Sequence, residues 1–204
     1  AMPMLLRHSH TSPFVRKVTV LLHETGLASQ VENETVDGWS EPDQLTADNP
    51  LSMVPTLVPD DGGSLYDSPV ICDYLDRQHT GPKMIPDDGP ARWRVLREQA
   101  LADGMLDSAV LIFVETFKRP QEKRWDWWLE VKQRAITRSL DLLEQRVDEF
   151  AGRVDLGTIS TAVALAYLDL RGAVGEWRDG RPGLSAWFAE FARRPSMIAT
   201  APPA

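Results

Sequence analysis

A hydroxyl side chain stands directly before a proline at two places in this sequence of 204 residues. The segment Ser9–Pro13 carries hydroxyls at its first, third and fourth positions, and Asp67–Pro69 carries an acid followed by a hydroxyl. Proline favours the first helical position, where its missing N–H costs nothing. A helix start also attracts anions through its free N–H groups and the positive end of its dipole. These residue types are equally typical of ordinary helix caps, so both interpretations stay open.

A third candidate position is Pro55, which interrupts a short apolar segment that is otherwise typical of a strand. Proline has no N–H to donate to a sheet ladder, so it is confined to edges, bulges and turns. We therefore expect Pro55 at a turn or an edge.

The first 79 residues must supply the elements that position these groups. Hydrophobic periodicity and turn residues predict, in order, a strand over Pro3–His8, a helix from Ser12 to Gly26, a strand over Gln30–Asp37, a weakly helical segment up to Asn49, a hairpin of Val54–Val58 with Ser64–Tyr66, and a helix from Asp67. The sequence PDDGG is a strong turn signal between the two hairpin strands. The predicted order is β-α-β-α-β-β-α.

The second half of the chain is predicted to be helical throughout. Gln78–Pro90 contains three prolines and two glycines, which is typical of a linker. Apolar residues then recur at helical spacing in four segments, which are Ala91–Arg119, Trp128–Phe150, Asp155–Leu170 and Leu184–Arg194. Asp155 and Thr158 read as a capping box with its usual residue types exchanged. We predict a domain at 1–79, a linker at 80–90 and an all-helical domain at 91–204.

Composition narrows the functional class. Lysine and arginine total 22 against 30 aspartates and glutamates, and the net charge of −8 argues against a general nucleic-acid or anionic-membrane binder. The single cysteine, Cys72, cannot form an internal disulfide, and no Cys/His ligand cluster is present. No apolar run is long enough for a membrane span. We expect a cytoplasmic protein that needs no metal.

Four segments in this order resemble the glutathione S-transferase family: TSPFVRKVTVLL, NPLSMVPTL, LYDSPVICDYL and TAVALAYLDLR. The resemblance covers essentially the whole chain and is strongest to the bacterial YibF-type members. It implies a thioredoxin-like α/β N-terminal domain, an all-α C-terminal bundle and a homodimer. It also implies glutathione as co-substrate and a small electrophile or peroxide as second substrate.

The resemblance assigns roles in glutathione binding to several candidate residues. It implies a cis Val54–Pro55 bond, which turns the N–H and C=O of Val54 outward to pair with the peptide backbone of the ligand. Ser68 would hold the γ-glutamyl carboxylate, and Asp67 the neighbouring ammonium. Many relatives carry lysine where Met53 stands, so the resemblance does not identify which residue binds the glycine carboxylate of glutathione. The candidates are His10, Arg16, Lys17 and Gln44.

A hydroxyl near the first helix start is expected to stabilise the thiolate of glutathione, which is the nucleophilic form. By alignment with family classes we favour Ser12 over Thr11, with Ser9 as a third candidate. None of the three positions is a cysteine, which favours conjugation or peroxide reduction over thiol reduction.

The sequence does not identify the second substrate, and it does not decide whether the protein is catalytically active. Four aromatic residues are candidates for lining the electrophile site, although at helical spacing an aromatic is more often core: Phe113, Phe117, Trp125 and Trp177. The competing function is a non-catalytic glutathione-binding or protein-interaction module with the same fold.

Overall fold

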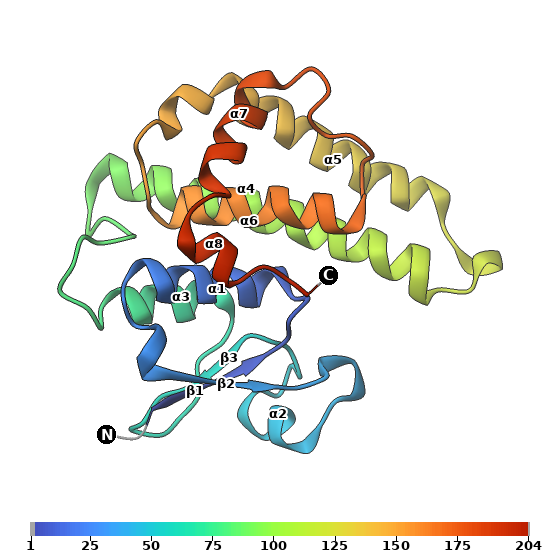
Figure 1. Cartoon of the computed structure of the whole chain (residues 1–204). Coiled ribbons are helices and arrows are strands. Elements are labelled where there is room, and N and C mark those ends of the chain that lie inside the picture. Colours follow the sequence, from blue (N-terminus) through green and yellow to red (C-terminus); the bar gives the residue numbers. More distant parts are fainter. Residues whose placement is uncertain (1–2, 204) are drawn as a thin grey trace. The chain divides into compact units, whose positions relative to one another are not determined.

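A three-stranded sheet lies at the centre of the first of two units into which the chain divides (Figure 1). The structure, a computed structural model, describes residues 3–203. Strand β1 (Met4–His8) is central, and it pairs in parallel with β2 (Val31–Thr35) and antiparallel with β3 (Thr56–Val58). The parallel pair is joined by a helix, as parallel strands require.

Two helices cover one face of this sheet, and they are α1 (Pro13–Glu24) and α3 (Ser68–Asp76) (Figure 1). They contact each other, and the short helix α2 (Asp43–Asp48) lies on the other side of the strands. Helix α1 buries its apolar residues against the sheet and ends before Gly26, whose φ of +73° lies in the left-handed region that favours glycine. Short 3₁₀ turns occupy Ala28–Gln30 and Gly38–Ser40.

A buried arginine joins the strands to α2. Arg7 of β1 donates from Nη1 to Glu34 at 2.6 Å and from Nη2 to Asp48 at 2.7 Å. A buried charge is tolerated only when it is paired, and two carboxylates meet that condition here.

The predicted hairpin is present in a reduced form. β3 spans only Thr56–Val58, and the second predicted strand contributes a single antiparallel bridge between Leu57 and Leu65. Both backbone hydrogen bonds of this bridge form, with Leu57 N to Leu65 O at 2.9 Å and Leu65 N to Leu57 O at 2.8 Å. The pairing stops after this bridge because the chain turns into α3 at Ser68.

The second unit, Pro90–Arg194, is helical. Its elements are α4 (Gly89–Phe113), a π-helical turn at Val114–Lys118, a 3₁₀ turn at Gln121–Lys123, α5 (Asp126–Gln145), a 3₁₀ turn at Val147–Phe150, α6 (Leu156–Arg171) and α7 (Pro182–Phe191). Trp177 is 1% exposed and belongs to the core, whereas Phe117 and Trp125 are exposed.

The C-terminal segment differs from the prediction. The sequence predicted that residues 195–204 belong to the helical domain and that its last helix ends at Arg194, directly before Pro195. In the structure Pro195 begins a short helix, α8 (Pro195–Ala199), which packs against α1 and groups with the sheet unit. Ser196 on α8 donates a hydrogen bond to Glu24 at the end of α1. Proline is equally acceptable at the first position of a new helix, so the residue alone could not separate the two outcomes.

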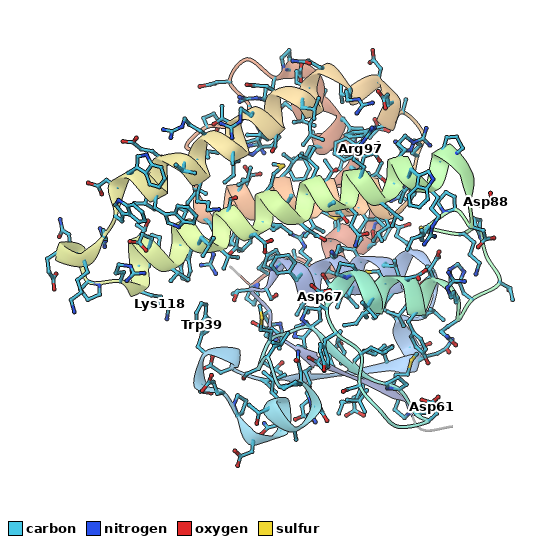
Figure 2. The ribbon with its side chains drawn as sticks, turned by 180° about the vertical axis from the view of Figure 1, so that it is seen from behind. Trp39, Asp61, Asp67, Asp88, Arg97 and Lys118 are labelled. Carbon is cyan, nitrogen blue, oxygen red and sulfur yellow. The ribbon has the colours of Figure 1, made fainter. Side chains whose placement is uncertain are left out.

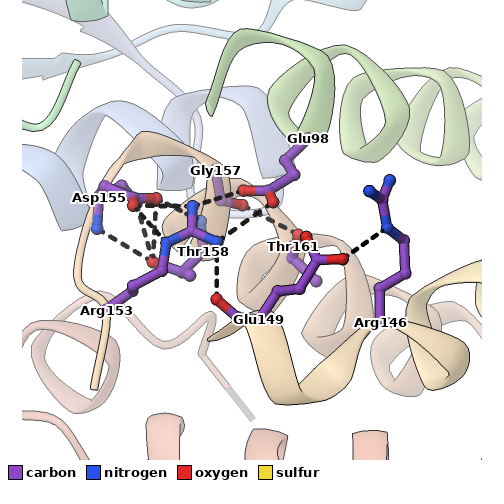
Figure 3. Close-up of polar contacts among 8 residues, drawn as sticks. All are labelled: Glu98, Arg146, Glu149, Arg153, Asp155, Gly157, Thr158 and Thr161. Carbon is purple, nitrogen blue, oxygen red and sulfur yellow. Dashed lines mark hydrogen bonds and ion pairs between the residues drawn. The ribbon is translucent and has the colours of Figure 1, made fainter. Parts of the chain in front are cut away.

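A buried ion pair and a capping box fix the start of α6 (Figure 3). Asp155 accepts from the N–H of Thr158 at 3.1 Å, and the hydroxyl of Thr158 accepts from the N–H of Asp155 at 3.0 Å. Arg153 donates to Glu98 of α4 from Nη2 at 2.7 Å and to Asp155 from Nε at 2.9 Å. Gly157 lies beneath this pair, and a Cβ added there would be 2.4 Å from Oε2 of Glu98. The predicted capping box is therefore present, and a glycine keeps room for the ion pair next to it.

We expect Gly157→Ala to lower the free energy of unfolding by about 2–4 kcal/mol, because the added methyl displaces a buried, paired carboxylate. Gly104→Ala is the matched control, since Gly104 also lies within a helix but a Cβ there would have no described atom within 4 Å. The control should be neutral or stabilising by up to about 1 kcal/mol from helix propensity. Urea titrations of both variants measure the difference, and equal losses would contradict this account of Gly157.

Candidate functional site

Strand register brings the three candidate segments to one edge of the sheet. Arg7 of β1 pairs with Thr56 of β3, so β1 ends and β3 begins at the same edge. The loop Ser9–Ser12 leaves β1 at this edge, and Val54–Pro55 enters β3 there. Leu65 pairs antiparallel with Leu57, so the chain runs from Leu65 toward this edge as well, and Asp67 follows two residues later. The fold therefore brings together residues separated by more than 50 positions in sequence.

The start of α1 is a capped helix end with a free hydroxyl proton. Ser12 is the N-cap residue, and its Oγ accepts from the N–H of Val15 at 3.3 Å. A serine hydroxyl can accept and donate at once, so this cap leaves its O–H available to a ligand. Ser12 and Ser9 both line a pocket of about 290 Å³, whereas Thr11 is exposed and does not line it.

The loop before β3 presents a free backbone edge. The Val54–Pro55 peptide bond is cis, and within residues 3–203 neither the N–H nor the C=O of Val54 forms a hydrogen bond. Asn49, which is 1% exposed, holds this loop from inside. Its Nδ2 donates to Met53 O at 3.1 Å and to Thr56 Oγ1 at 3.0 Å, and its Oδ1 accepts from Leu51 N at 2.9 Å. The loop that presents the free N–H and C=O of Val54 is thus held in place by the side-chain amide of Asn49.

The start of α3 carries the acid Asp67, which is labelled in Figure 2, followed by the hydroxyl of Ser68. Asp67 occupies the N-cap position, yet its carboxylate accepts no capping hydrogen bond. Ser68 is 2% exposed, and its hydroxyl forms no hydrogen bond with the described residues. The capping interpretation therefore holds for Ser12 but not for Asp67. The free N–H groups of this first turn, together with the acid, suit a ligand that carries an anionic and a cationic group side by side.

The pocket beside Ser12 is lined by histidines from β1, the following loop and α1. We call it the histidine pocket and define it by His8, His10, Ser12, Arg16, His23 and Thr200. The rings of His8 and His10 lie 4.8 Å apart between centroids, edge to face. Burial lowers the pKa of His8, and the nearby His10 lowers it further. The Nδ1 atom of His8 is buried and has no hydrogen-bond partner among residues 3–203.

Sequence reasoning missed several residues that shape this region. Asn49 and Thr56 form the support of the Val54 loop, and His8, His23 and Thr200 contribute to the histidine pocket. An asparagine directly before proline in an otherwise apolar segment was a signal for Asn49. Thr200 gave no signal, because its place depends on α8 packing back onto α1. Of the candidate partners for a ligand carboxylate, Lys17 is fully buried, whereas Gln44 and His10 are exposed.

The described residues contain neither a cluster of metal-ligating side chains nor a membrane-spanning helix. Between residues 3 and 203, no group of three or more His, Cys, Asp or Glu side chains is arranged to hold a metal ion. Within the same range, no helix is both long and apolar enough to cross a membrane.

The family model and the similar proteins found by comparison agree on one family. The family model for the N-terminal domain of glutathione S-transferase matches residues 6–83. The chain is 35% identical to the uncharacterised GST-like protein YibF of Escherichia coli K12, over 98% of this chain and 99% of that protein.

Solved structures of similar proteins contain glutathione or a derivative. A glutathione transferase family member from Pseudomonas fluorescens Pf-5, with bound glutathione, is 46% identical with a TM-score of 0.96, covering 98% of this chain and 100% of that one. A structure from the same organism with bound S-(propanoic acid)-glutathione is 47% identical with a TM-score of 0.90 and the same coverage. The likeness agrees with the expected fold class, a thioredoxin-like unit and a helical region.

We expect Asn49→Ala to lower the free energy of unfolding by about 1–3 kcal/mol, because it leaves buried partners without their hydrogen bonds. Amide hydrogen exchange should accelerate over residues 50–56, which this side chain supports. Gln44→Ala is the control, since Gln44 is exposed on the neighbouring helix. Unchanged exchange in the loop of the Asn49 variant would show that Val54 is positioned by other contacts.

A second expectation concerns pH. The pKa of His8 is lowered in the folded state from its usual 6.5, so the unfolded chain takes up this proton at a higher pH. Acidification below that value must therefore favour unfolding through this residue. Unfolding measured between about pH 7.5 and pH 5 should show the wild type losing more stability than His8→Gln. Parallel pH profiles for the two proteins would contradict a lowered pKa of His8 in the folded state.

Proposed function

The chain belongs to the glutathione S-transferase family, and we propose that it is an active glutathione transferase that ionises the thiol of bound glutathione and directs the thiolate at a small electrophile or peroxide. The observation that carries this proposal is that three groups with hydrogen-bonding capacity left over among residues 3–203 lie at one edge of the sheet. These groups are the hydroxyl of Ser12, the backbone of Val54 and the acid–hydroxyl pair at Asp67–Ser68. Glutathione has a complementary group for each of them.

The proposed binding mode follows from the chemistry of each group. The backbone N–H and C=O of Val54 pair with the peptide backbone of glutathione as an added strand. The start of α3 takes the γ-glutamyl end, where Ser68 and the free N–H groups hold the carboxylate and Asp67 holds the ammonium. Pro55 and Ser9 complete this region of the site. The N-terminal residues 1–79 are thus proposed as the glutathione-binding domain.

Ser12 is proposed as the catalytic hydroxyl, with Thr11 as the alternative. Ser12 accepts from Val15 N, and this bond leaves the O–H of Ser12 able to donate to a ligand. Such a donation to a thiolate contributes about 1.5–3 kcal/mol, which corresponds to roughly one to two units of thiol pKa. The positive end of α1 acts in the same direction.

The ligands of the similar proteins support a thioether-forming reaction. The Pseudomonas fluorescens protein binds glutathione and also an S-substituted glutathione. None of the three hydroxyl positions near α1 is a cysteine, so a mixed disulfide cannot form there. We propose a detoxifying conjugation in the cytoplasm by a homodimer, with glutathione as co-substrate and without a metal.

The test is a titration of the thiolate absorbance of bound glutathione against pH. We expect the wild type to lower the thiol pKa by about one unit or more, and Ser12→Ala to abolish that shift. Thr11→Ala is the matched control, because Thr11 is exposed and adjacent in sequence. Loss of the shift in the Thr11 variant alone would move the catalytic role to that residue. An unshifted pKa in the wild type would favour the non-catalytic binding module.

A further inference from the structure

The histidine pocket concentrates positive and protonatable groups in an acidic protein. The chain has four histidines and a net charge of −8, and three of the four histidines line this pocket together with Arg16. Among residues 3–203, no aspartate or glutamate lines it. The remaining walls contribute neutral groups, with Asn33 and Thr35 on β2 and alanines at the C-terminal tail. The pocket therefore offers donors to an anion and no repelling charge.

Arg16 is the strongest of these groups, because it is half-buried without a carboxylate partner. Its Nη2 donates to Met197 O at 3.0 Å and its Nε reaches Thr200 Oγ1 at 3.5 Å, and no ion pair forms within the described chain. Burial without such a partner lowers the pKa of Arg16. By contrast, the buried Arg7 and Arg153 each pair with two carboxylates. Arg16 alone among these three retains a charge that an external anion can neutralise.

The size and position of the pocket limit the ligand. Its volume of about 290 Å³ is near the lower end for small-molecule sites. Ser12, the proposed thiolate hydroxyl, lines the same pocket, so a molecule bound there lies next to the reacting sulfur.

We propose that the histidine pocket binds the carboxylate of the electrophilic substrate, so that the acceptor of this transferase is a small organic acid. This inference rests on the proposed function and specifies the substrate class for the same site. Arg16 supplies the permanent charge, and the carboxylate accepts a charge-assisted hydrogen bond from it. The imidazole rings of His8, His10 and His23 line the same pocket and offer further hydrogen-bonding groups to the ligand.

Two synthetic conjugates test the proposal directly. S-(2-carboxyethyl)glutathione and S-propylglutathione have S-substituents of the same length and differ only in the terminal carboxylate. We expect calorimetric titration near pH 6.5 to show about ten-fold or stronger preference for the carboxyethyl conjugate.

Variants then identify the residue responsible. Arg16→Gln should abolish the preference, so that the two conjugates bind to this variant with equal affinity. His10→Gln, at an exposed position, should reduce the preference two- to three-fold without disturbing the fold. Arg77→Gln, an exposed arginine on the end of α3, is the matched control and should retain the full preference.

Two results would overturn the inference while leaving the proposed function intact. One is equal affinity of the wild type for both conjugates. The other is an equal loss of glutathione and both conjugates in Arg16→Gln, which would show that Arg16 holds the tripeptide's own carboxylate. If the wild type binds neither glutathione nor either conjugate, the proposed function itself fails and this inference falls with it.

Discussion

The antiparallel pairing of β3 determines where every candidate group of the first unit lies. β3 pairs with β1 on one side and through a single bridge with Leu65 on the other. Because the register sets Arg7 opposite Thr56 and Leu57 opposite Leu65, the loops that follow β1, precede β3 and precede α3 emerge at one edge. A slip of one residue would turn the side chains of β3 to the wrong face and move Val54 away from the start of α3. The site therefore depends on backbone pairing more than on any single side chain.

The charged side chains of this acidic protein fall into two groups, those that pair with an opposite charge in the protein and those that do not. Glu98 and Arg153 in the helical unit, like Arg7 with its two acids, satisfy each other and fix local geometry. Asp67 and Arg16 differ, because each carries a charge without a protein counter-ion among the described residues. An unpaired charge near a buried surface lowers stability unless something else compensates it. A ligand with both an ammonium and carboxylates would provide that compensation.

Local signals predicted the elements that depend on neighbours in sequence. The starts of α1 and α3 follow from Ser12–Pro13 and Ser68–Pro69, and the capping box at Asp155 was visible in its residue types. Long-range features could not be predicted in this way.

The return of α8 to α1 depends on a contact between distant segments. The reduction of the hairpin to one bridge and the hydrogen bonds of Asn49 depend on the exact path of a loop, which residue types alone do not determine. The roles of the site residues came from a family resemblance. The structure adds that these residues lie at one edge of the sheet and that some of their hydrogen-bonding groups have no partner among residues 3–203. The histidine pocket was not foreseen, because its walls come from segments separated by almost the whole chain length.

The central claim is that the free backbone at Val54 and the start of α3 together bind glutathione. Amide-resolved NMR during a glutathione titration tests this claim most directly. The account predicts that the amide signals of Val54 and Ser68 shift together and saturate at the same ligand concentration. If both signals stay in place while glutathione binds elsewhere, or if no signal moves, the account is contradicted.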